Sequence, residues 1–516
     1  MVKNEKISLK QFVWNGFNYI FGITFMNYFS SLVMSENGQN GLGLNIIWIF
    51  LLAACVAFVC TFCIKKTSEK LQDADHDGGI MLYSLKSFKN KRIGVFAGTI
   101  QFFMFPIVIA TQSNMIIKNV FSPSILNFSD NQNIEIPTNI LDLGPFTNLI
   151  LSLCGIAIMC GCMLVCIKGI GWFKKVLNYS SLIKWVTSAP FIILAIYFAC
   201  SKSQDNIPFW YQNSNLEFGL FVKAFNTSFY LLCGFEILIT SAKSLENPKK
   251  DVGKGIVLTM MVSITSVIIF MLILLCAFDA FSSNTDIFEW SQNGIPYILS
   301  QIGLYMSIFT IIFMYINAAV QDGLYSAATL SPLASINFFS KKITATNKKG
   351  IPVKSIVTFV GIILIFDFIL LIIPDFIQGF KTLGCYNDYG DSREGHIKAI
   401  SLSKEPFDVS SLSQAAGAMA LCLYAISFLC LLNLELKNNK KNWKLDIPCF
   451  ISFIIVCSMF LYHYVQEIID VTNNIGNELF MPNLVKLVAE LCIVIIILIV
   501  FFLRYKKTIY YEKTHK

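Results

Sequence analysis

Charged residues are scarce in this sequence. They make up 14% of its 516 residues, while hydrophobic residues make up 55%, and a soluble globular chain carries about 25% charge. This composition excludes an ordinary soluble domain. The net charge of +8 is divided into small groups between apolar runs rather than gathered into one basic patch, which argues against nucleic acid as a partner. We expect the chain to lie in a lipid bilayer.

Histidine is also rare, and the cysteines form no recognisable site. The chain has four histidines and 16 cysteines, and most cysteines lie inside apolar runs, where they act as small apolar residues. No CxxC pair stands near a histidine, so we expect no metal site, no cofactor and no disulfide framework. The apolar segments also lack a Ser/His/Asp, HExxH or paired-carboxylate constellation. An enzyme is therefore not expected.

Long apolar segments are abundant. A helix needs about 20 apolar residues to cross the hydrocarbon core, and candidates of this length follow one another along nearly the whole chain. We therefore predict one continuous all-α polytopic membrane domain with about twelve transmembrane helices. The predicted spans are 12–34, 43–63, 93–117, 146–167, 176–200, 219–241, 255–281, 300–330, 355–374, 411–434, 446–466 and 482–503.

The basic residues test this number of spans independently. Cytoplasmic loops carry an excess of lysine and arginine, and a missed or false span would invert this bias in every later loop. Of the 40 basic residues, 31 lie in the two termini and the even-numbered loops, and six lie in the odd-numbered loops. We expect both termini, 1–10 and 506–516, to be cytoplasmic and the protein to lie in the cell membrane. The predicted spans contain three lysines, of which Lys223 and Lys486 are close enough to span ends to snorkel.

Two predicted spans contain a glycine among aromatic residues near mid-membrane. Gly22 lies in NYIFGITF of the first span, and Gly234 lies in FYLLCGFE of the sixth, five spans later. Secondary transporters built from inverted repeats place discontinuous helices at corresponding positions of both halves, because unwound backbone offers free N–H and C=O groups to a substrate. Close helix packing also explains either glycine taken singly. Their paired position favours interrupted helices.

Three stretches of sequence follow one another in a characteristic order. They are DGGIMLYSLKSF (77–88) with GVFAG (94–98), GFE (234–236) with AKSLENPKK (242–250), and Pro332 with FFSKK (338–342) and NKKGIP (347–352). In this order and at these spans, they resemble the motifs of the amino acid–polyamine–organocation (APC) permeases. The resemblance extends over the first ten predicted spans.

This resemblance implies a fold and an activity. The fold is a five-plus-five inverted repeat of the LeuT type, with the first repeat at 11–200, the second at 217–434 and two additional helices at 445–505. The implied function is secondary active transport of an amino acid by alternating access, proton-coupled or independent of sodium. An amino acid/polyamine exchanger and a membrane protein that binds substrate without transporting it are the alternatives. The polar outer loop 375–407 either caps the outer face or is a solvated insertion.

The resemblance also implies roles for particular residues. Tyr230 corresponds to an aromatic residue that closes over bound substrate, and Glu236 to an acid that couples gate movements. Both residues have a structural alternative, which is packing or an interfacial position for Tyr230 and stabilisation of unwound backbone for Glu236. Gln101 is a candidate for contact with the substrate side chain, and interhelical hydrogen bonds are its alternative. The expected substrate-binding residues are Gly22, Ile23, Thr24, Gln101, Tyr230, Cys233, Gly234 and Phe235.

Lys184 is the only basic residue placed well inside a predicted span. A charged lysine at such a depth costs at least about 2.5 kcal/mol on insertion scales, and burial favours its neutral form, which makes proton release feasible. In the resemblance, a lysine here replaces the cation that sodium-coupled relatives hold between spans 1, 5 and 8. We therefore expect Lys184 to couple transport to protons. Snorkelling to the cytoplasmic face is the alternative.

The expected site contains backbone dipoles, a tyrosine and neutral polar groups, with Glu236 as its only nearby acid. A zwitterionic amino acid with a neutral side chain matches these groups, because its carboxylate suits helix N-terminal amides and its ammonium suits free carbonyls. A dicarboxylate matches them poorly.

Overall fold

The computed structural model describes most of the chain, and its regular secondary structure is helical. One isolated parallel bridge pairs Ile7 with Leu245. The described residues are 6–22, 32–33, 41–71, 79–88, 91–118, 121, 144–212, 214–232, 234, 238–239, 245–277, 297–335, 339–347, 351–389, 407, 409–437, 443–477 and 480–514.

The helices follow the apolar segments of the sequence, and polar or glycine-containing stretches separate them. Their bounds are α1 Leu9–Ile20, α3 Asn45–Leu71, α4 Gly79–Ser87, α5 Lys91–Ser113, η1 Asn114–Lys118, α7 Thr147–Val165, η2 Cys166–Lys168, α8 Ile170–Gln212, α9 Phe218–Leu232, α11 Pro248–Ala277, α13 Tyr297–Ala328, α14 Leu330–Ser335, α15 Val353–Asp367, η4 Phe368–Ile372, α16 Ile373–Tyr389, α18 Val409–Lys437, α19 Trp443–Asn473 and α20 Phe480–Thr514.

Ten helices in the described part of the chain are long and apolar enough to cross a membrane. The two predicted spans outside this group are the first and the sixth, which contain the short helices α1 and α9. The helix α1 has 12 residues and ends at Ile20, and α9 has 15 residues and ends at Leu232. Both helices end where the sequence predicts an interruption. The architecture is that of a polytopic helical membrane protein.

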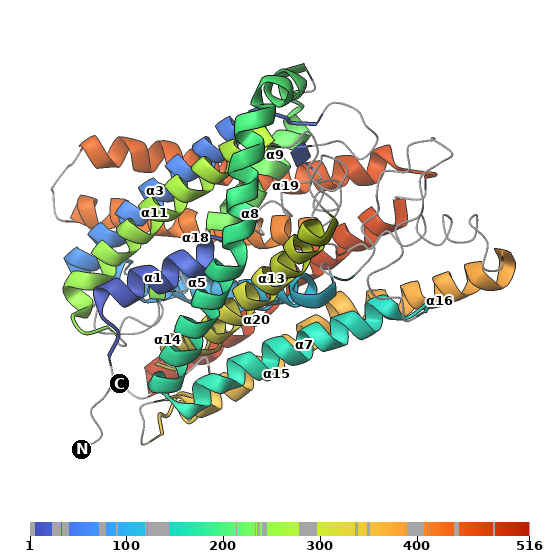
Figure 1. Cartoon of the computed structure of the whole chain (residues 1–516). Coiled ribbons are helices and arrows are strands. Elements are labelled where there is room, and N and C mark those ends of the chain that lie inside the picture. The colour runs from blue at the N-terminus through green and yellow to red at the C-terminus, as the bar shows by residue number, and fades with distance from the viewer. Residues whose placement is uncertain are drawn as a thin grey trace.

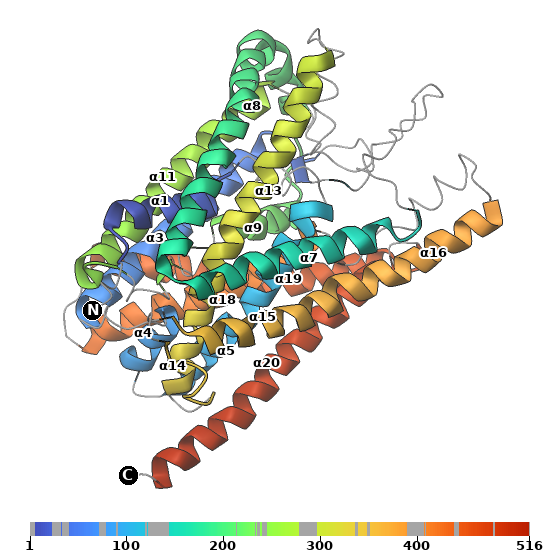
Figure 2. The same ribbon diagram turned by 60° about the horizontal axis from the view of Figure 1, so that its bottom comes forward.

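The two short helices lie among long ones. The helix α1 packs against α11 and α13, and α9 packs against α3 and α18. Figures 1 and 2 show the long helix α8 running past α11 and α13, and α20 leaving the bundle at its edge. The helix α7 lies along α15 and α16. The long helices therefore enclose the ends of α1 and α9.

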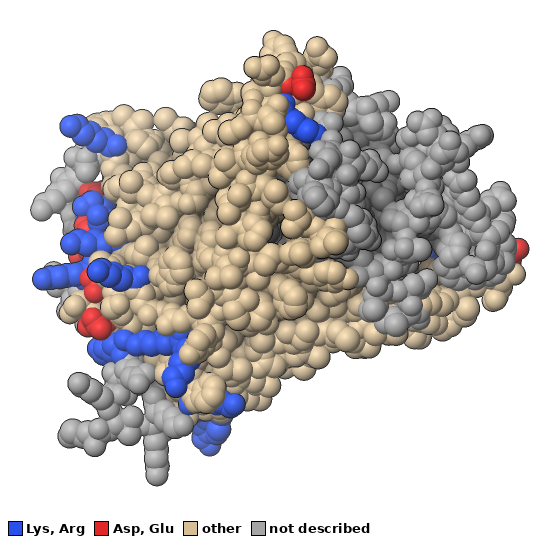
Figure 3. Space-filling view, viewed as in Figure 1, with Lys and Arg blue, Asp and Glu red and all other residues tan. Residues whose placement is uncertain are grey.

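The described outer surface is largely apolar, and its charged residues gather mainly at one end. Large apolar side chains such as Trp48, Ile193 and Leu498 are exposed on the long helices, as expected for contact with lipid. Figure 3 shows most of the visible lysines and arginines at one end of the molecule, which is the end where both termini lie in Figure 1. This distribution agrees with the charge bias of the loops.

Some helix ends differ from the expected spans. The helix α8 continues to Gln212, well beyond position 200, because Asn206 donates a hydrogen bond to the Cys276 carbonyl oxygen (3.0 Å) and Trp210 is buried. Residues 375–389, expected as the first part of the outer loop 375–407, form the helix α16. Hydropathy measures the length of the apolar segment. A helix continues beyond that segment where its next side chains form hydrogen bonds or are buried against other helices.

Lys223 and Lys486, which the sequence places close enough to span ends to snorkel, both have carboxylate partners on neighbouring helices. Lys486 is buried and its ammonium lies 2.7 Å from Glu467 Oε1, so α20 is bonded to α19. Lys223 lies 2.6 Å from Asp470 Oδ2, which bonds α9 to α19. Each pair joins two neighbouring helices, and pairing with a carboxylate lowers the cost of placing a lysine in an apolar segment.

The buried Lys486–Glu467 pair predicts a large loss of stability when one partner is removed. Glu467→Gln leaves a buried ammonium without this carboxylate, and breaking such a pair costs about 3–5 kcal/mol. We expect a clear fall in the thermal unfolding midpoint of the purified protein in detergent. The matched control is Glu69→Gln in the exposed Lys66–Glu69 pair, which is worth at most about 1 kcal/mol. Equal shifts in the two variants would contradict the assignment.

Candidate functional site

The site is built at the end of α1. Ser8 caps the beginning of this helix by accepting a hydrogen bond from the Gln11 backbone N–H, and Phe21 ends it in an extended conformation with φ −103° and ψ 131°. A helix that stops leaves its last carbonyl oxygens without helical partners. In an apolar environment these oxygens need donors from elsewhere in the protein.

Lys184 of α8 supplies those donors. Its ammonium donates hydrogen bonds to the carbonyl oxygens of Asn18 (3.1 Å) and Phe21 (2.9 Å). The side chain is 1% exposed, and its nitrogen lies 5.1 Å from the centre of the Trp185 ring. The Trp185 indole N–H donates to Asn18 Oδ1 (2.8 Å). Lys184 therefore points into the protein toward α1 rather than snorkelling to a membrane face.

A second set of polar contacts fixes α1 and α8 to α13. The Asn317 side-chain nitrogen lies 2.9 Å from the hydroxyl oxygens of both Ser180 and Ser181. Gln321, one turn further along α13, donates hydrogen bonds to the Asn15 carbonyl oxygen (3.1 Å) and to Asn317 Oδ1 (2.8 Å). The three helices are thus joined by side-chain hydrogen bonds.

A buried carboxylate lies beside these contacts. The Tyr19 hydroxyl donates a hydrogen bond to Asp322 Oδ1 (2.9 Å) and accepts one from the Gln112 side-chain amide (3.4 Å). Asp322 is 0% exposed. The cluster joins α1, α5 and α13, and it adds an acid to the site, so the expectation that Glu236 is the only nearby acid is wrong. The sequence signal for Asp322 is that it is an ionisable residue inside the predicted span 300–330.

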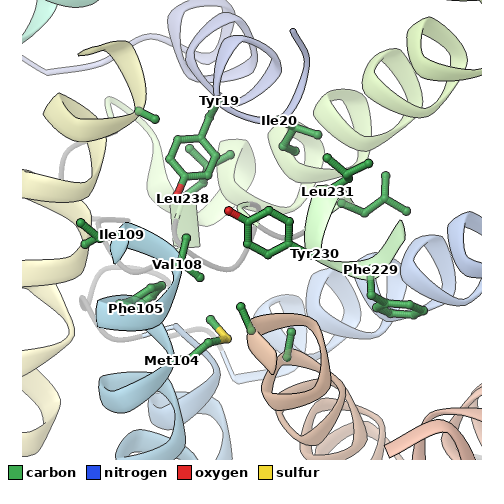
Figure 4. Close-up of a cluster of buried hydrophobic side chains, with 14 of the residues drawn as sticks. Tyr19, Ile20, Met104, Phe105, Val108, Ile109, Phe229, Tyr230, Leu231 and Leu238 are labelled. Atoms are coloured by element: carbon green, nitrogen blue, oxygen red, sulfur yellow. The ribbon is translucent and has the colours of Figure 1, made fainter. Parts of the chain in front are cut away.

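Gly234 and Tyr230 lie on the other side of Tyr19. Gly234 has φ +127°, a conformation that residues with a β-carbon rarely adopt, and a β-carbon there would lie 2.5 Å from Tyr19 Cδ1. Figure 4 shows the Tyr230 hydroxyl directed toward the Tyr19 ring, with Val108 of α5 beside them. The ends of α1 and α9 therefore meet at Tyr19.

Gly22 is also closely packed, since a β-carbon there would collide with the Met314 side chain of α13. Gln101 is buried on α5, but it is 11 residues from Gln112, which is about 16 Å along a helix. Gln112 rather than Gln101 thus reaches the Tyr19 cluster. The other expected site residues, Ile23, Thr24, Cys233, Phe235 and Glu236, lie outside the described residues.

Interrupted helices that meet at a buried polar cluster inside a polytopic helical protein are typical of secondary transporters. The family model for the amino acid permeases matches residues 7–503. The chain therefore belongs to the amino acid permease family of the APC superfamily, and the resemblance seen in the sequence is confirmed. This membership identifies it as a membrane transporter of amino acids. A search of curated proteins found no match.

The geometry at Gly234 predicts that this position does not tolerate a β-carbon. Gly234→Val combines an unfavourable φ with a collision against the Tyr19 ring, so we expect uptake into proteoliposomes to be abolished. The control is Gly361→Val on α15, where a β-carbon meets no atom within 4 Å. Normal uptake by a Gly234→Val protein that is expressed at the usual level would show that this position tolerates a β-carbon and would contradict the prediction.

Proposed function

We propose that the protein is a secondary active transporter that moves an amino acid across the cell membrane by alternating access, coupled to protons and independent of sodium. The observation that carries this proposal is the end of α1, where two backbone carbonyls are held by a buried lysine of α8. The family supplies the substrate class.

Substrate recognition in this proposal uses the ends of α1 and α9. Free amides at a helix N-terminus favour a carboxylate, and free carbonyls favour an ammonium. The backbone of 22–24 and 233–235 supplies these groups, Tyr230 closes over the substrate from outside, and Glu236 couples the movement of α9 to closure. The contact of Gly234 with Tyr19 supports this arrangement, because it brings the two helix ends together.

Proton coupling in this proposal rests on Lys184. As a cation, its ammonium binds the α1 carbonyls in the way that a bound metal cation would. A neutral amine has two donor hydrogens and no charge, so its attraction to the carbonyl dipoles is weaker. Loss of the proton therefore loosens the contact between α1 and α8 and permits the two helices to separate. A protein with its own fixed ammonium has no need of sodium at this position.

We further propose twelve spans in a five-plus-five inverted repeat with two additional helices, and cytoplasmic termini. The short helices α1 and α9 support the repeat, since they stand at corresponding positions of the two halves. The basic residues at the end that carries both termini support the orientation.

An exchanger of amino acids or polyamines and a protein that binds substrate without transport are the alternative functions. Uptake measurements with the protein reconstituted into vesicles distinguish these alternatives from proton-coupled transport. A transporter coupled to protons accumulates an amino acid in empty vesicles with saturable kinetics. An exchanger requires internal substrate, and a binding protein shows no flux.

Lys184→Ala tests the coupling proposal. We expect wild-type uptake into proteoliposomes to be unchanged when sodium is replaced by potassium and to increase under an inward proton gradient. Lys184→Ala removes the ammonium that binds α1, so uptake is lost while substrate binding partly survives. The control is Lys202→Ala on the same helix, which we expect to keep the proton response.

Two results would contradict the coupling proposal. One is sodium-dependent uptake by the wild-type protein. The other is a Lys184→Ala protein that still responds to the proton gradient. Either would leave Lys184 as a structural link between α1 and α8.

A further inference from the structure

A second group of buried polar side chains lies where α19 packs against α9 and α20. It contains His463 of α19, the only histidine whose side chain the structure describes. His463 is 2% exposed, and its Nε2 lies 3.0 Å from Glu490 Oε2 of α20. Its Nδ1 lies 3.3 Å from the side-chain nitrogen of Asn226 on α9. The imidazole ring therefore links three helices.

The charges at this junction balance only when the imidazole carries a second proton. The described buried and half-buried charged side chains here are three carboxylates and two lysines, namely Asp470, Glu467, Glu490, Lys223 and Lys486. The two lysines pair with Asp470 and Glu467, so Glu490 is left facing His463. A neutral ring leaves one buried negative charge without compensation, which is costly. A protonated ring compensates it.

The other described groups around His463 do not change this balance. The Tyr464 ring lies 5.2 Å from the imidazole, between ring centres, and Cys422 of α18 lies near Tyr464. Both side chains are ordinarily uncharged at neutral pH.

The neighbouring helices α3 and α18 carry charged residues only in their last two turns. The end of α3 lies near the beginning of α19, because Cys63 Sγ is 2.8 Å from Cys449 Sγ. Cys449 is about 21 Å along the helix from His463. The charges of α3 and α18 therefore lie far from the imidazole.

Asn226 can bind the imidazole in either protonation state. A neutral ring with its proton on Nε2 donates to Glu490 and accepts at Nδ1 from the Asn226 side-chain nitrogen. A protonated ring donates from both nitrogens and needs the Asn226 side-chain oxygen instead. That oxygen is buried and accepts no hydrogen bond from any described residue, and a flip of the amide presents it to the ring. This unsatisfied oxygen favours the protonated ring independently of the charge balance.

Asn226 lies one turn before Tyr230 on α9, and the Tyr230 hydroxyl is directed toward the end of α1 (Figure 4). We propose that His463 and Glu490 form a proton-binding site that holds α9 against α19 through Asn226. A hydrogen bond from a charged donor is stronger than one between neutral groups. Loss of the proton therefore weakens the link to α9 and leaves Glu490 uncompensated. The site is separate from the coupling role proposed for Lys184.

The protonation state is tested by nitrogen-15 NMR of the purified full-length protein with labelled histidine. The His463 signal is the one that is missing in His463→Gln. We expect an imidazolium ring in the wild-type protein at neutral pH. In Glu490→Gln, which keeps the size of the side chain and removes its charge, we expect a neutral ring at the same pH. A neutral ring in the wild-type protein, or a charged ring in both proteins, would overturn the proposal.

The link to α9 is tested by hydrogen exchange of the backbone amides of residues 218–232, corrected for the intrinsic pH dependence of exchange. Protection against exchange measures local opening. In the wild-type protein we expect this protection to fall roughly tenfold across the pH range in which His463 loses its proton. His463→Gln has no ionisable ring and should show no such change. A ring that keeps its proton wherever the protein stays folded, or protection of α9 that does not follow the titration, would overturn the proposal.

The matched control removes the other link between the same two helices. Lys223→Met combined with Asp470→Asn takes away a balanced pair and no group that ordinarily titrates near neutral pH. We expect this double variant to lower the protection of α9 by the same factor at every pH and to keep the pH-dependent change. Loss of the pH-dependent change in this variant as well would assign the effect to any contact between α9 and α19 and would overturn the proposal.

Neither measurement depends on transport. An uncharged His463 would overturn this inference and leave the coupling proposed for Lys184 unaffected. A wild-type protein that shows no uptake would refute transport and leave the proton-binding site in place.

Discussion

The central constraint on this protein is that a helix which ends inside an apolar environment must have its backbone groups satisfied by the rest of the protein. The helix α1 ends at Ile20, and Lys184 of α8 binds the carbonyl oxygens of Asn18 and Phe21. A buried ammonium and two carbonyl groups without helical partners are each costly alone. Together they compensate one another, and this contact fixes the position of α8 relative to the end of α1.

The same helix end is fixed from a second side by α13. Gln321 binds the Asn15 carbonyl oxygen, and Asp322 accepts a hydrogen bond from Tyr19. The end of α1 therefore lies between a cation on α8 and an anion on α13. A change in the charge of either group changes how strongly α1 is held, which gives a physical route from substrate or proton binding to helix movement.

The other buried charges behave differently. Lys486 and Glu467 form a pair, as do Lys118 and Asp375, and these pairs join neighbouring helices without leaving an oxygen directed at the meeting point of α1 and α9. Asp322 differs from these pairs in its partner, because it accepts a hydrogen bond from the neutral Tyr19 hydroxyl at the end of α1.

The sequence by itself determined the helical membrane class and the family, and it marked the positions near which α1 and α9 end. These properties depend on local composition and on short motifs, such as the paired glycines Gly22 and Gly234. It also pointed to Lys184, because a lysine deep in an apolar segment is unusual on its own.

Only the tertiary structure decided which side chains meet. Tyr19 and Asp322 are 303 residues apart, and Lys486 pairs with Glu467 of the preceding helix. The hydropathy of a segment reports that it is buried but not which neighbour it faces, so Asp322 went unassigned and Lys486 was expected at the surface. The contacts between helices depend on how the whole set packs, and that packing placed Lys184 and Asp322 at the same end of α1.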